Sequence, residues 1–383
     1  MQNTNHVVGI DIEQFVLDPF ASGVQRVLQY LAKEWPTDLP THFVVPSENQ
    51  FKLLTPNQAY ELLSIPFDSG ITGLDLGAAV TEHVRNLVTA TCSESELMNM
   101  FTLWFLPEVS YEPRVLRRFE AFQQIVPTAM IGYDVLPMTH PNNYMFTPGT
   151  LANVSEFFRL VGSTDTLICI SDYAKDSIME TLRRDPTKTT VVAHPGGDHI
   201  SARTKEPKSN SRITYLRLGT IEARKAPIEI LEAFAQAVTK HPDRDIELHI
   251  VGKPASVDIY LNEAIEQAIA RGLPIRWTQG ATDQEVAEIV RDSDLFLSYG
   301  IEGYGIPVLE SIQMGTPVLF DGIQPAAEIM ESHGAQRSPL EQVFTHQAEQ
   351  LVSESDQARV PSWKGYVQRV TEQLKINSPR NSL

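Results

Sequence analysis

The sequence predicts an α/β protein with two parallel-sheet domains. Short apolar segments typical of buried strands alternate along the chain with segments of helical spacing. This alternation stops at a polar stretch, residues 201–211, and starts again after it. A length of 383 residues also exceeds what one hydrophobic core usually organises. We therefore expect two domains, residues 1–200 and 212–360, joined by a linker at 201–211 and facing each other across a ligand cleft.

The chain is expected to begin with a strand, a glycine turn and a helix. Residues 7–11 form a short apolar strand, and apolar residues at helical spacing from Val24 predict a helix to about Trp35. Ser22 is suited to cap this helix, and Gly23 permits close approach of another group to the backbone. An ordinary turn between a strand and a helix explains Gly23 equally well.

The rest of the first domain continues the alternation. Helical spacing is found around residues 60–63, 115–122, 151–160 and 171–184, and strand-like segments at 42–45, 101–106, 128–137, 166–170 and 190–193. The segment 128–137 contains the polar pair Tyr133-Asp134, and polar groups at the carboxyl end of a parallel strand face the ligand crevice. Asp134 is therefore a candidate site residue, with a helix or turn cap as its alternative role.

The second domain repeats this order. Strand-like segments lie at 213–218, 246–251, 275–277, 294–298 and 317–320, and helical segments at 227–238, 259–270, 286–290 and 306–314. Thr282 and Glu285 have the spacing of a capping box ahead of the third of these helices.

A glycine-flanked loop at residues 300–305 connects one of these strands to the helix that begins near Pro307. Proline costs little in a first helical turn, and free N–H groups together with the helix dipole make such a loop a candidate anion site. Two carboxylates bracket the loop, Glu302 and Glu310. They suit the hydroxyls of a sugar or a ribose attached to a phosphate.

Arg224 and Lys225 follow the first strand of the second domain, just ahead of a helix. Adjacent cations at such a strand end suit a diphosphate, because arginine binds it through a bidentate fork and lysine as a point charge. Ordinary surface basicity is the alternative, although positive charge is mildly unfavourable at a helix start.

The composition limits the partners of the chain. A net charge of -17 argues against nucleic acid, whose binding depends on clustered Lys and Arg. The sequence shows neither a signal peptide nor an apolar run long enough to span a membrane. We expect a cytoplasmic protein, with weak peripheral association at the inner face of a membrane left open. Its oligomeric state is unknown.

Cysteine and histidine usage predicts no metal centre. Cys92 and Cys169 form neither a disulfide framework nor a zinc spacing, which indicates a reducing compartment. His194 and His199 straddle a Pro-Gly-Gly turn and are expected to be turn residues. The Asp-x-Asp triplets at 243–245 and 292–294 precede their strands and so face away from the predicted cleft.

Residues 302–310 resemble the signature of glycosyltransferase family 4, a retaining family of the GT-B fold. That signature is two glutamates separated by seven residues, with glycines and a proline between them, and here Gly-Thr-Pro-Val follows at 315–318. Residues 22–27 are similar to the first glycine loop of a subgroup with Gly-Ile/Val-Gln-Arg-Val there. Weaker matches are the serine turn at 171–175, the phosphate segment at 219–225 and the helix start at 362–363.

The resemblance implies two Rossmann-like domains and a C-terminal helix, within 361–383, that packs back on the first of them. It implies transfer of a sugar from a nucleotide-diphospho-sugar to an acceptor hydroxyl, without a metal ion or another cofactor. Glu302 would lie near the sugar hydroxyls and Glu310 at the ribose, while Arg224 and Lys225 would neutralise the diphosphate. The further donor-binding positions it implies are Gly23, Gly219, Thr220, Gly303, Tyr304 and Gly305.

Three positions depart from the family pattern. Thr220 stands where many members have arginine, Tyr133-Asp134 replaces a frequent His-Asp pair, and Ser298-Tyr299 replaces Pro-Ser. Asp134 is the candidate if the reaction uses a dedicated protein base. The sugar, the nucleotide and the acceptor are not specified, and a glycan, a lipid-linked intermediate, a small molecule and a protein all fit as acceptors. A nucleotide-sugar epimerase of the same fold and a non-catalytic nucleotide-sugar-binding protein are the alternative functions.

Overall fold

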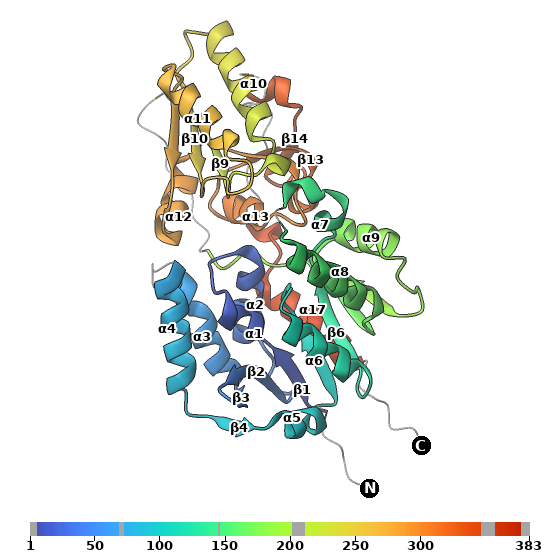
Figure 1. The fold of residues 1–383 in the computed structure, drawn as a ribbon. Coiled ribbons are helices and arrows are strands. Elements are labelled where there is room, and N and C mark those ends of the chain that lie inside the picture. The colour runs from blue at the N-terminus through green and yellow to red at the C-terminus, as the bar shows by residue number, and fades with distance from the viewer. Residues whose placement is uncertain (1–5, 69–72, 145, 201–210, 346–356, 377–383) are drawn as a thin grey trace. The chain divides into compact units, whose positions relative to one another are not determined.

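The computed structural model describes residues 6–68, 73–144, 146–200, 211–345 and 357–376. The chain divides into two compact units, each an α/β unit in which helices pack against one sheet (Figure 1). The first unit comprises Met1–Val135, Phe146–Pro195 and Trp363–Leu383, and the second comprises Leu136–Met145 and Gly196–Ser362. Most of the predicted linker, residues 201–210, lies outside the described residues.

The first unit is built on an eight-stranded sheet in the order β4-β3-β2-β1-β5-β6-β7-β8. The strands are β1 (Val8–Asp11), β2 (Thr41–Ser47), β3 (Gln50–Leu54), β4 (Ala90–Cys92), β5 (Leu103–Leu106), β6 (Thr128–Gly132), β7 (Thr166–Cys169) and β8 (Thr189–Val192). The sheet is parallel from β2 to β8, as the sequence predicts, and β3 and β4 add an antiparallel edge. The predicted strand at 128–137 was too long, because β6 ends at Gly132 and the chain turns into a short helix, α7 (Leu136–Thr139).

The antiparallel edge was missed because its pattern is broken by a lysine. Lys52 lies in the middle of β3, yet its side chain is buried. Its ammonium group donates to the carbonyl oxygens of Val84, Arg85 and Leu87 at 2.7, 2.9 and 2.8 Å, at the end of helix α4. Those carbonyls have no partner within the helix, so a distant lysine satisfies them.

Helices cover both the parallel strands and the edge of this unit. They are α1 (Glu13–Leu17), α2 (Gly23–Lys33), α3 (Pro56–Asp68), α4 (Gly73–Asn86), α5 (Glu94–Met100), α6 (Pro113–Gln123), α8 (Pro148–Ser163), α9 (Asp172–Thr181) and α17 (Trp363–Ile376). Helix α17 packs on α2, where Trp363 stacks on Tyr30 with ring centroids 4.7 Å apart. The last helix of the described chain therefore belongs to the first unit.

Ser22 caps α2 as the sequence predicts. Its hydroxyl accepts from the backbone N–H of Gln25 at 3.1 Å, which satisfies one of the free donors of the first turn. Ser22→Ala is expected to lower the free energy of unfolding by about 1 kcal/mol. Chemical denaturation measures this, with Ser22→Asp as the control that keeps a capping oxygen and most of the stability. Equal losses in both variants would contradict the capping role.

The second unit is built on a six-stranded sheet, all of it parallel, in the order β11-β10-β9-β12-β13-β14. The strands are β9 (Ile213–Leu218), β10 (Ile246–Val251), β11 (Ile275–Thr278), β12 (Leu295–Ile301), β13 (Val318–Ile323) and β14 (Ala335–Arg337). Strand β9 lies between β10 and β12, so the segments that follow β9 and β12 meet although about 80 residues separate them in sequence.

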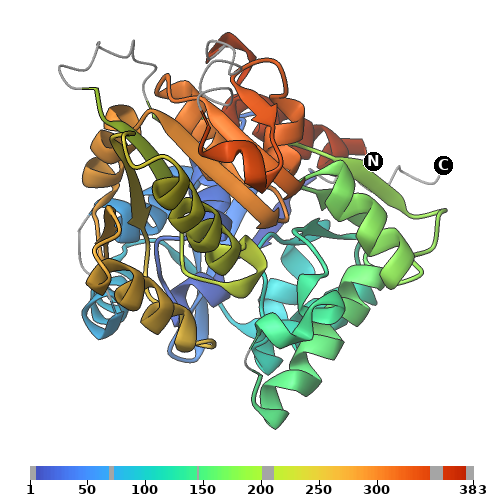
Figure 2. The same ribbon diagram turned by 90° about the horizontal axis from the view of Figure 1, so that it is seen from above.

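The helices of this unit agree with the predicted ones apart from short additions. They are α10 (Pro227–Lys240), α11 (Tyr260–Ala270), α12 (Asp283–Asp292), α13 (Ile306–Gln313), α14 (Pro325–Ile329) and α15 (Leu340–Val343), with 3-10 turns η1 (Pro141–Asn143), η2 (Ala223–Lys225) and η3 (Gln357–Arg359). Helix α10, yellow-green in Figure 2, lies over the sheet and runs nearly along its strands. The capping box of Thr282 and Glu285 is confirmed at the start of α12. No helix within the described ranges is long and apolar enough to cross a lipid bilayer.

Candidate functional site

The segment after β9 is held against the neighbouring strand end by two glycines. Gly219 has φ +114°, and its N–H donates to the carbonyl of Val251 at 2.8 Å. A Cβ on Gly252 would come within 2.0 Å of the carbonyl oxygen of Gly219, so these two backbones touch. Only glycine fits there. The contact fixes the predicted phosphate segment at the carboxyl edge of the sheet.

The turn η2 is held by the strand on the other side. Gly300, near the end of β12, has φ +88°, and a Cβ there would lie 2.0 Å from the carbonyl oxygen of Arg224. Gly322 in β13 approaches the carbonyl of Gly300 in the same way, at 2.2 Å for its hypothetical Cβ. The turn that carries Arg224 and Lys225 thus lies against the end of β12, and β13 lies behind that strand end.

The structure brings both predicted cations onto Glu302. Lys225 Nζ lies 2.9 Å from Glu302 Oε1, and Arg224 donates to Glu302 Oε2 at 2.8 Å and to the carbonyl of Ile301 at 2.7 Å. Arg224 also pairs with Glu222 at 2.6 Å. The side chains of Lys225, Arg224 and Glu302 are only about one-fifth exposed or less, so their charges attract each other through a medium of lower polarity than water.

The cations determine the ionisation of this glutamate. Burial opposes the charged form, but Lys225 and Arg224 outweigh it and hold the pKa of Glu302 at about 2. Burial also opposes the charge of Arg224, and the carboxylates of Glu302 and Glu222 outweigh it and raise the pKa of that guanidinium. Glu302 is therefore a permanent carboxylate at neutral pH, and both of its oxygens bind cations.

Arg217 is a further cation of the site, which the sequence analysis missed. It lies in β9 with only 4% of its surface exposed, and it donates to the carbonyl oxygens of Gly219 and, at 2.9 Å, Thr220. Burial lowers its pKa to about 10, so the group is still charged at neutral pH. An arginine inside a strand pattern gives no local sign of this role. The guanidinium holds the backbone of the segment after β9. This segment includes Thr220, which departs from the family pattern.

The loop behind β12 leads into α13 at the predicted place. Gly305 precedes the helix with φ +104°, and its carbonyl accepts from the N–H of Val308 at 3.0 Å. The side chain of Tyr304 is buried, and its carbonyl accepts from Ala326 at 2.9 Å. Gly303, also buried, precedes it. The loop is thereby fixed to the start of α14, and it offers backbone rather than the tyrosine ring to a ligand.

Glu310, in the second turn of α13, has an unforeseen partner. His199 Nε2 lies 2.7 Å from Glu310 Oε1, and the two side chains are 4% and 12% exposed. His199 lies in a turn, as predicted, and in addition its imidazole is buried against this carboxylate. The two residues are 111 positions apart in sequence, so no local spacing could have shown the contact.

The candidate residues of the first unit lie in a different body of the protein. Gly23 starts α2 behind its cap Ser22, and Asp134 follows β6, half-buried and close enough to Tyr111 and Tyr173 to raise their pKa values alongside burial. The hydroxyl of Tyr133 donates to the carbonyl of Pro107 at 2.9 Å, and the ring is buried. The hydroxyl of Tyr133 is therefore engaged with the backbone of its own unit.

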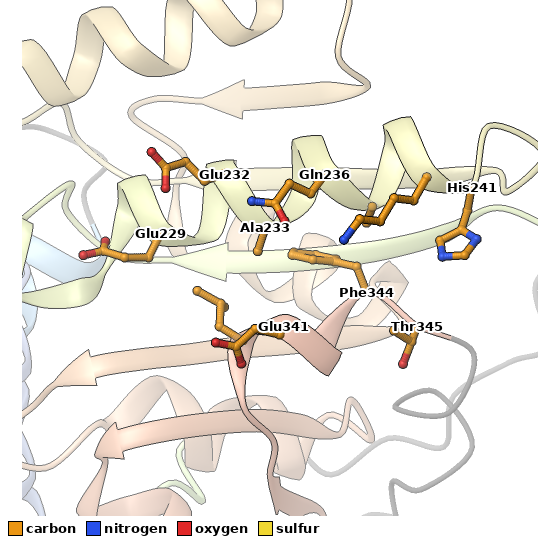
Figure 3. Close-up of a pocket in the computed structure, with 11 residues that line it drawn as sticks. Glu229, Glu232, Ala233, Gln236, His241, Glu341, Phe344 and Thr345 are labelled. Atoms are coloured by element: carbon orange, nitrogen blue, oxygen red, sulfur yellow. The ribbon is translucent and has the colours of Figure 1, made fainter.

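A larger hollow lies elsewhere in the second unit. It measures about 360 Å³ between α10 and α15, with Glu229 and Glu232 on one side and Glu341 on the other (Figure 3). Phe344, at its floor, packs in the core against Tyr215 and Phe234. None of the residues predicted for the donor lines this hollow. A much smaller one, about 20 Å³, is lined by Lys225, Glu302 and Gly305 among others.

Sequence comparison relates the second unit to sugar-transferring enzymes. Residues 198–355 match the family model described as glycosyl transferases group 1. The chain is similar to the D-inositol 3-phosphate glycosyltransferase of Rhodococcus erythropolis, with 28% identity over 42% of the chain and 39% of the relative. It is also similar to the serotype-specific mannosyltransferase WbdA of Escherichia coli, with 23% identity over 85% of the chain and 40% of the relative. The chain thus spans about two fifths of the length of these curated relatives.

Structural comparison shows the fold. The crystal structure of Anabaena Alr3699/HepE, in complex with UDP and glucose, matches with a TM-score of 0.64 at 13% identity and covers 97% of this chain and 100% of that one. Likeness at this identity shows architecture alone. Residues 198–355 are thus similar to the glycosyl transferases group 1 model, and the two parallel-sheet units give the chain the GT-B fold.

Proposed function

We propose that the protein is a retaining glycosyltransferase that moves a sugar from a nucleotide-diphospho-sugar to an acceptor hydroxyl without a metal ion. The cluster of Lys225, Arg224 and Glu302 carries this proposal. It lies beside Gly219 and the start of α13, at the carboxyl edge where parallel α/β sheets bind ligands. The UDP-bound Alr3699/HepE shares the fold and supports a nucleotide-sugar donor.

The chemical task of the cluster is to stabilise a leaving group. As the bond between the anomeric carbon and the phosphate oxygen breaks, its electron pair stays on the diphosphate. Glu302 uses one of the three ammonium hydrogens of Lys225, which leaves others for a phosphate. The ammonium lies over Gly219, 3.1 Å from where a Cβ would be, so the absence of a side chain leaves room next to the charge. Fixed cations of this kind stabilise developing charge without reorganising.

Metal independence rests on where the paired aspartates lie. Asp245 pairs with Arg212 at 2.8 Å, and Asp294 accepts from the N–H of Thr214 at 2.8 Å. Both precede their strands, at the sheet edge opposite Lys225. These carboxylates are engaged in joining strand starts, and the cations of the cluster supply the countercharge for the diphosphate instead.

Retention follows if the acceptor attacks the face from which the diphosphate leaves. The acceptor proton then passes to the departing phosphate oxygen, and no protein base is required. Asp134 stays the candidate for a dedicated base, and Gly23 for a contact with the phosphates. The inositol phosphate in the name of one relative favours a small polyol as the acceptor, and the name of the mannosyltransferase favours mannose as the transferred sugar. The cytoplasmic location stays a prediction.

Nucleotide binding tests the proposal directly. UDP, GDP and ADP, and their glucose or mannose conjugates, are screened by thermal shift, and at least one should raise the melting temperature. Glu310→Ala should weaken binding of that nucleoside diphosphate about 10-fold or more, since hydrogen bonds to a charged group are lost. Glu331→Ala, a surface glutamate behind α14, is the control and should bind normally.

Product analysis separates the proposal from its rivals. Conversion of the nucleotide sugar in the absence of any acceptor would identify an epimerase. Tight binding without transfer to any acceptor tested would identify a binding protein. Transfer with inversion at the anomeric carbon, measured by NMR of the product, would contradict the retaining mechanism.

A further inference from the structure

We propose that His199 is a positioning residue that orients Glu310 toward the ribose hydroxyls of a nucleoside diphosphate. This inference rests on the proposed function and assigns a task to a residue outside the glutamate signature. Its starting point is the 2.7 Å contact between His199 Nε2 and Glu310 Oε1.

The backbone, rather than a flexible side chain, places this imidazole. Gly197 packs so tightly on α13 that a Cβ would come within 2.4 Å of Leu309 Cβ. The N–H of Gly197 donates to the carbonyl of Pro361 at 3.0 Å, which holds the segment from its other side. Two residues later the chain therefore reaches Glu310 with little freedom. The imidazole is therefore placed by a backbone that packs directly on the helix that carries the carboxylate.

The contact has a defined hydrogen-bond direction. A carboxylate accepts but does not donate, so Nε2 of His199 carries the hydrogen in this contact and Oε1 receives it. The ribose diol would present two further donors. The bond from the imidazole to Oε1 restrains the side chain of Glu310. A carboxylate fixed before binding loses less conformational freedom when the ribose arrives.

A purely structural role predicts a different behaviour. If His199 only joined the segment 196–199 to α13, its loss would lower the stability of the protein and would weaken the binding of all nucleotides alike. A positioning role instead predicts that its loss erases the preference for the intact diol. The discriminating quantity is therefore the ratio of affinities for a ribonucleotide and its 2′-deoxy counterpart.

The experiment measures this ratio by calorimetry on the full chain. The probes are UDP, GDP and ADP with their 2′-deoxy and 3′-deoxy analogues, and the variants are His199→Ala and His199→Gln. The wild-type chain should prefer the ribonucleotide about 10-fold or more over at least one analogue, as expected for a lost hydrogen bond to a charged group. His199→Ala should reduce this preference to about 3-fold or less, and His199→Gln, which keeps an N–H donor, should recover part of it.

A double-mutant cycle completes the test. In a Glu310→Ala background, His199→Ala should cause no further loss of discrimination, because the two residues act through one contact. Equal weakening of ribo- and deoxynucleotides by His199→Ala would overturn the inference while leaving the proposed function intact. Failure of the wild-type chain to bind any of the nucleotides would overturn both. Melting temperatures of each variant exclude loss of the fold as the cause.

Discussion

Lys225→Ala is expected to lower the turnover of sugar transfer about 100-fold or more, which matches the loss of one fixed electrostatic contact to a transition state. The reason is the position of the ammonium group, over Gly219 and 2.9 Å from Glu302 Oε1. At this position the ammonium group meets the charge that builds on the departing diphosphate. The effect should fall on kcat more than on KM, since the charge is largest in the transition state.

The control for this variant comes from the same helical region. Lys240→Ala removes an exposed lysine from the end of α10, and turnover should stay unchanged. Glu302 keeps Arg224 as a partner in Lys225→Ala, so the fold should persist, and a thermal melt checks this. Near-normal turnover of Lys225→Ala would remove the residue from the site and weaken the proposed function.

Glu108→Gln is expected to change how stability depends on pH. Glu108 follows β5 and is 4% exposed, and its Oε1 accepts from the amide of Gln25 at 3.1 Å. Burial first, and then the carboxylates of Asp18 and Asp11, raise the pKa of Glu108 from 4.5 to about 8. The folded protein therefore binds a proton that the unfolded chain releases above pH 4.5.

The sign of the effect follows from this difference. A folded pKa above the unfolded one gives a contribution that is complete below about pH 4.5 and is lost as the pH rises through about 8. The loss amounts to at most about 5 kcal/mol on the scale of 1.4 kcal/mol per pKa unit. The side chain introduced by Glu108→Gln cannot ionise. Between pH 5 and pH 9, the free energy of unfolding of this variant should therefore rise relative to that of the wild type by up to this amount.

Urea denaturation at several pH values measures the difference. Glu94→Gln, which alters an exposed carboxylate on α5, is the control and should keep the wild-type pH dependence. Parallel curves for wild type and Glu108→Gln would contradict a buried, neutral Glu108. Glu108 is also linked to the turn ahead of α2 through Gln25. The side-chain amide of Gln25 donates to the carbonyl of Asp18 at 2.9 Å and accepts from the N–H of Phe20 at 2.8 Å.

Local patterns predicted most elements because their causes are local. The caps at Ser22 and Thr282 form within one helical turn, and the structure confirms both. Buried parallel strands are apolar on both faces, which makes them visible in the sequence. The failures were the edge strands β3 and β4, where Lys52 is buried through contacts with a helix end more than 30 residues away.

The sequence by itself determined the order of strands and helices, the pair of glutamates around the loop and the two adjacent cations. Only the tertiary structure decided what these groups touch. Strand β9 pairs with β12 as well as with β10, the next strand in sequence. Arg224 and Lys225 therefore meet Glu302 across 78 and 77 positions. Likewise, His199 reaches Glu310 only because the chain packs against α13 at Gly197. Such contacts depend on the order of strands in the sheet and on close backbone approach, and neither leaves a periodic trace in the sequence.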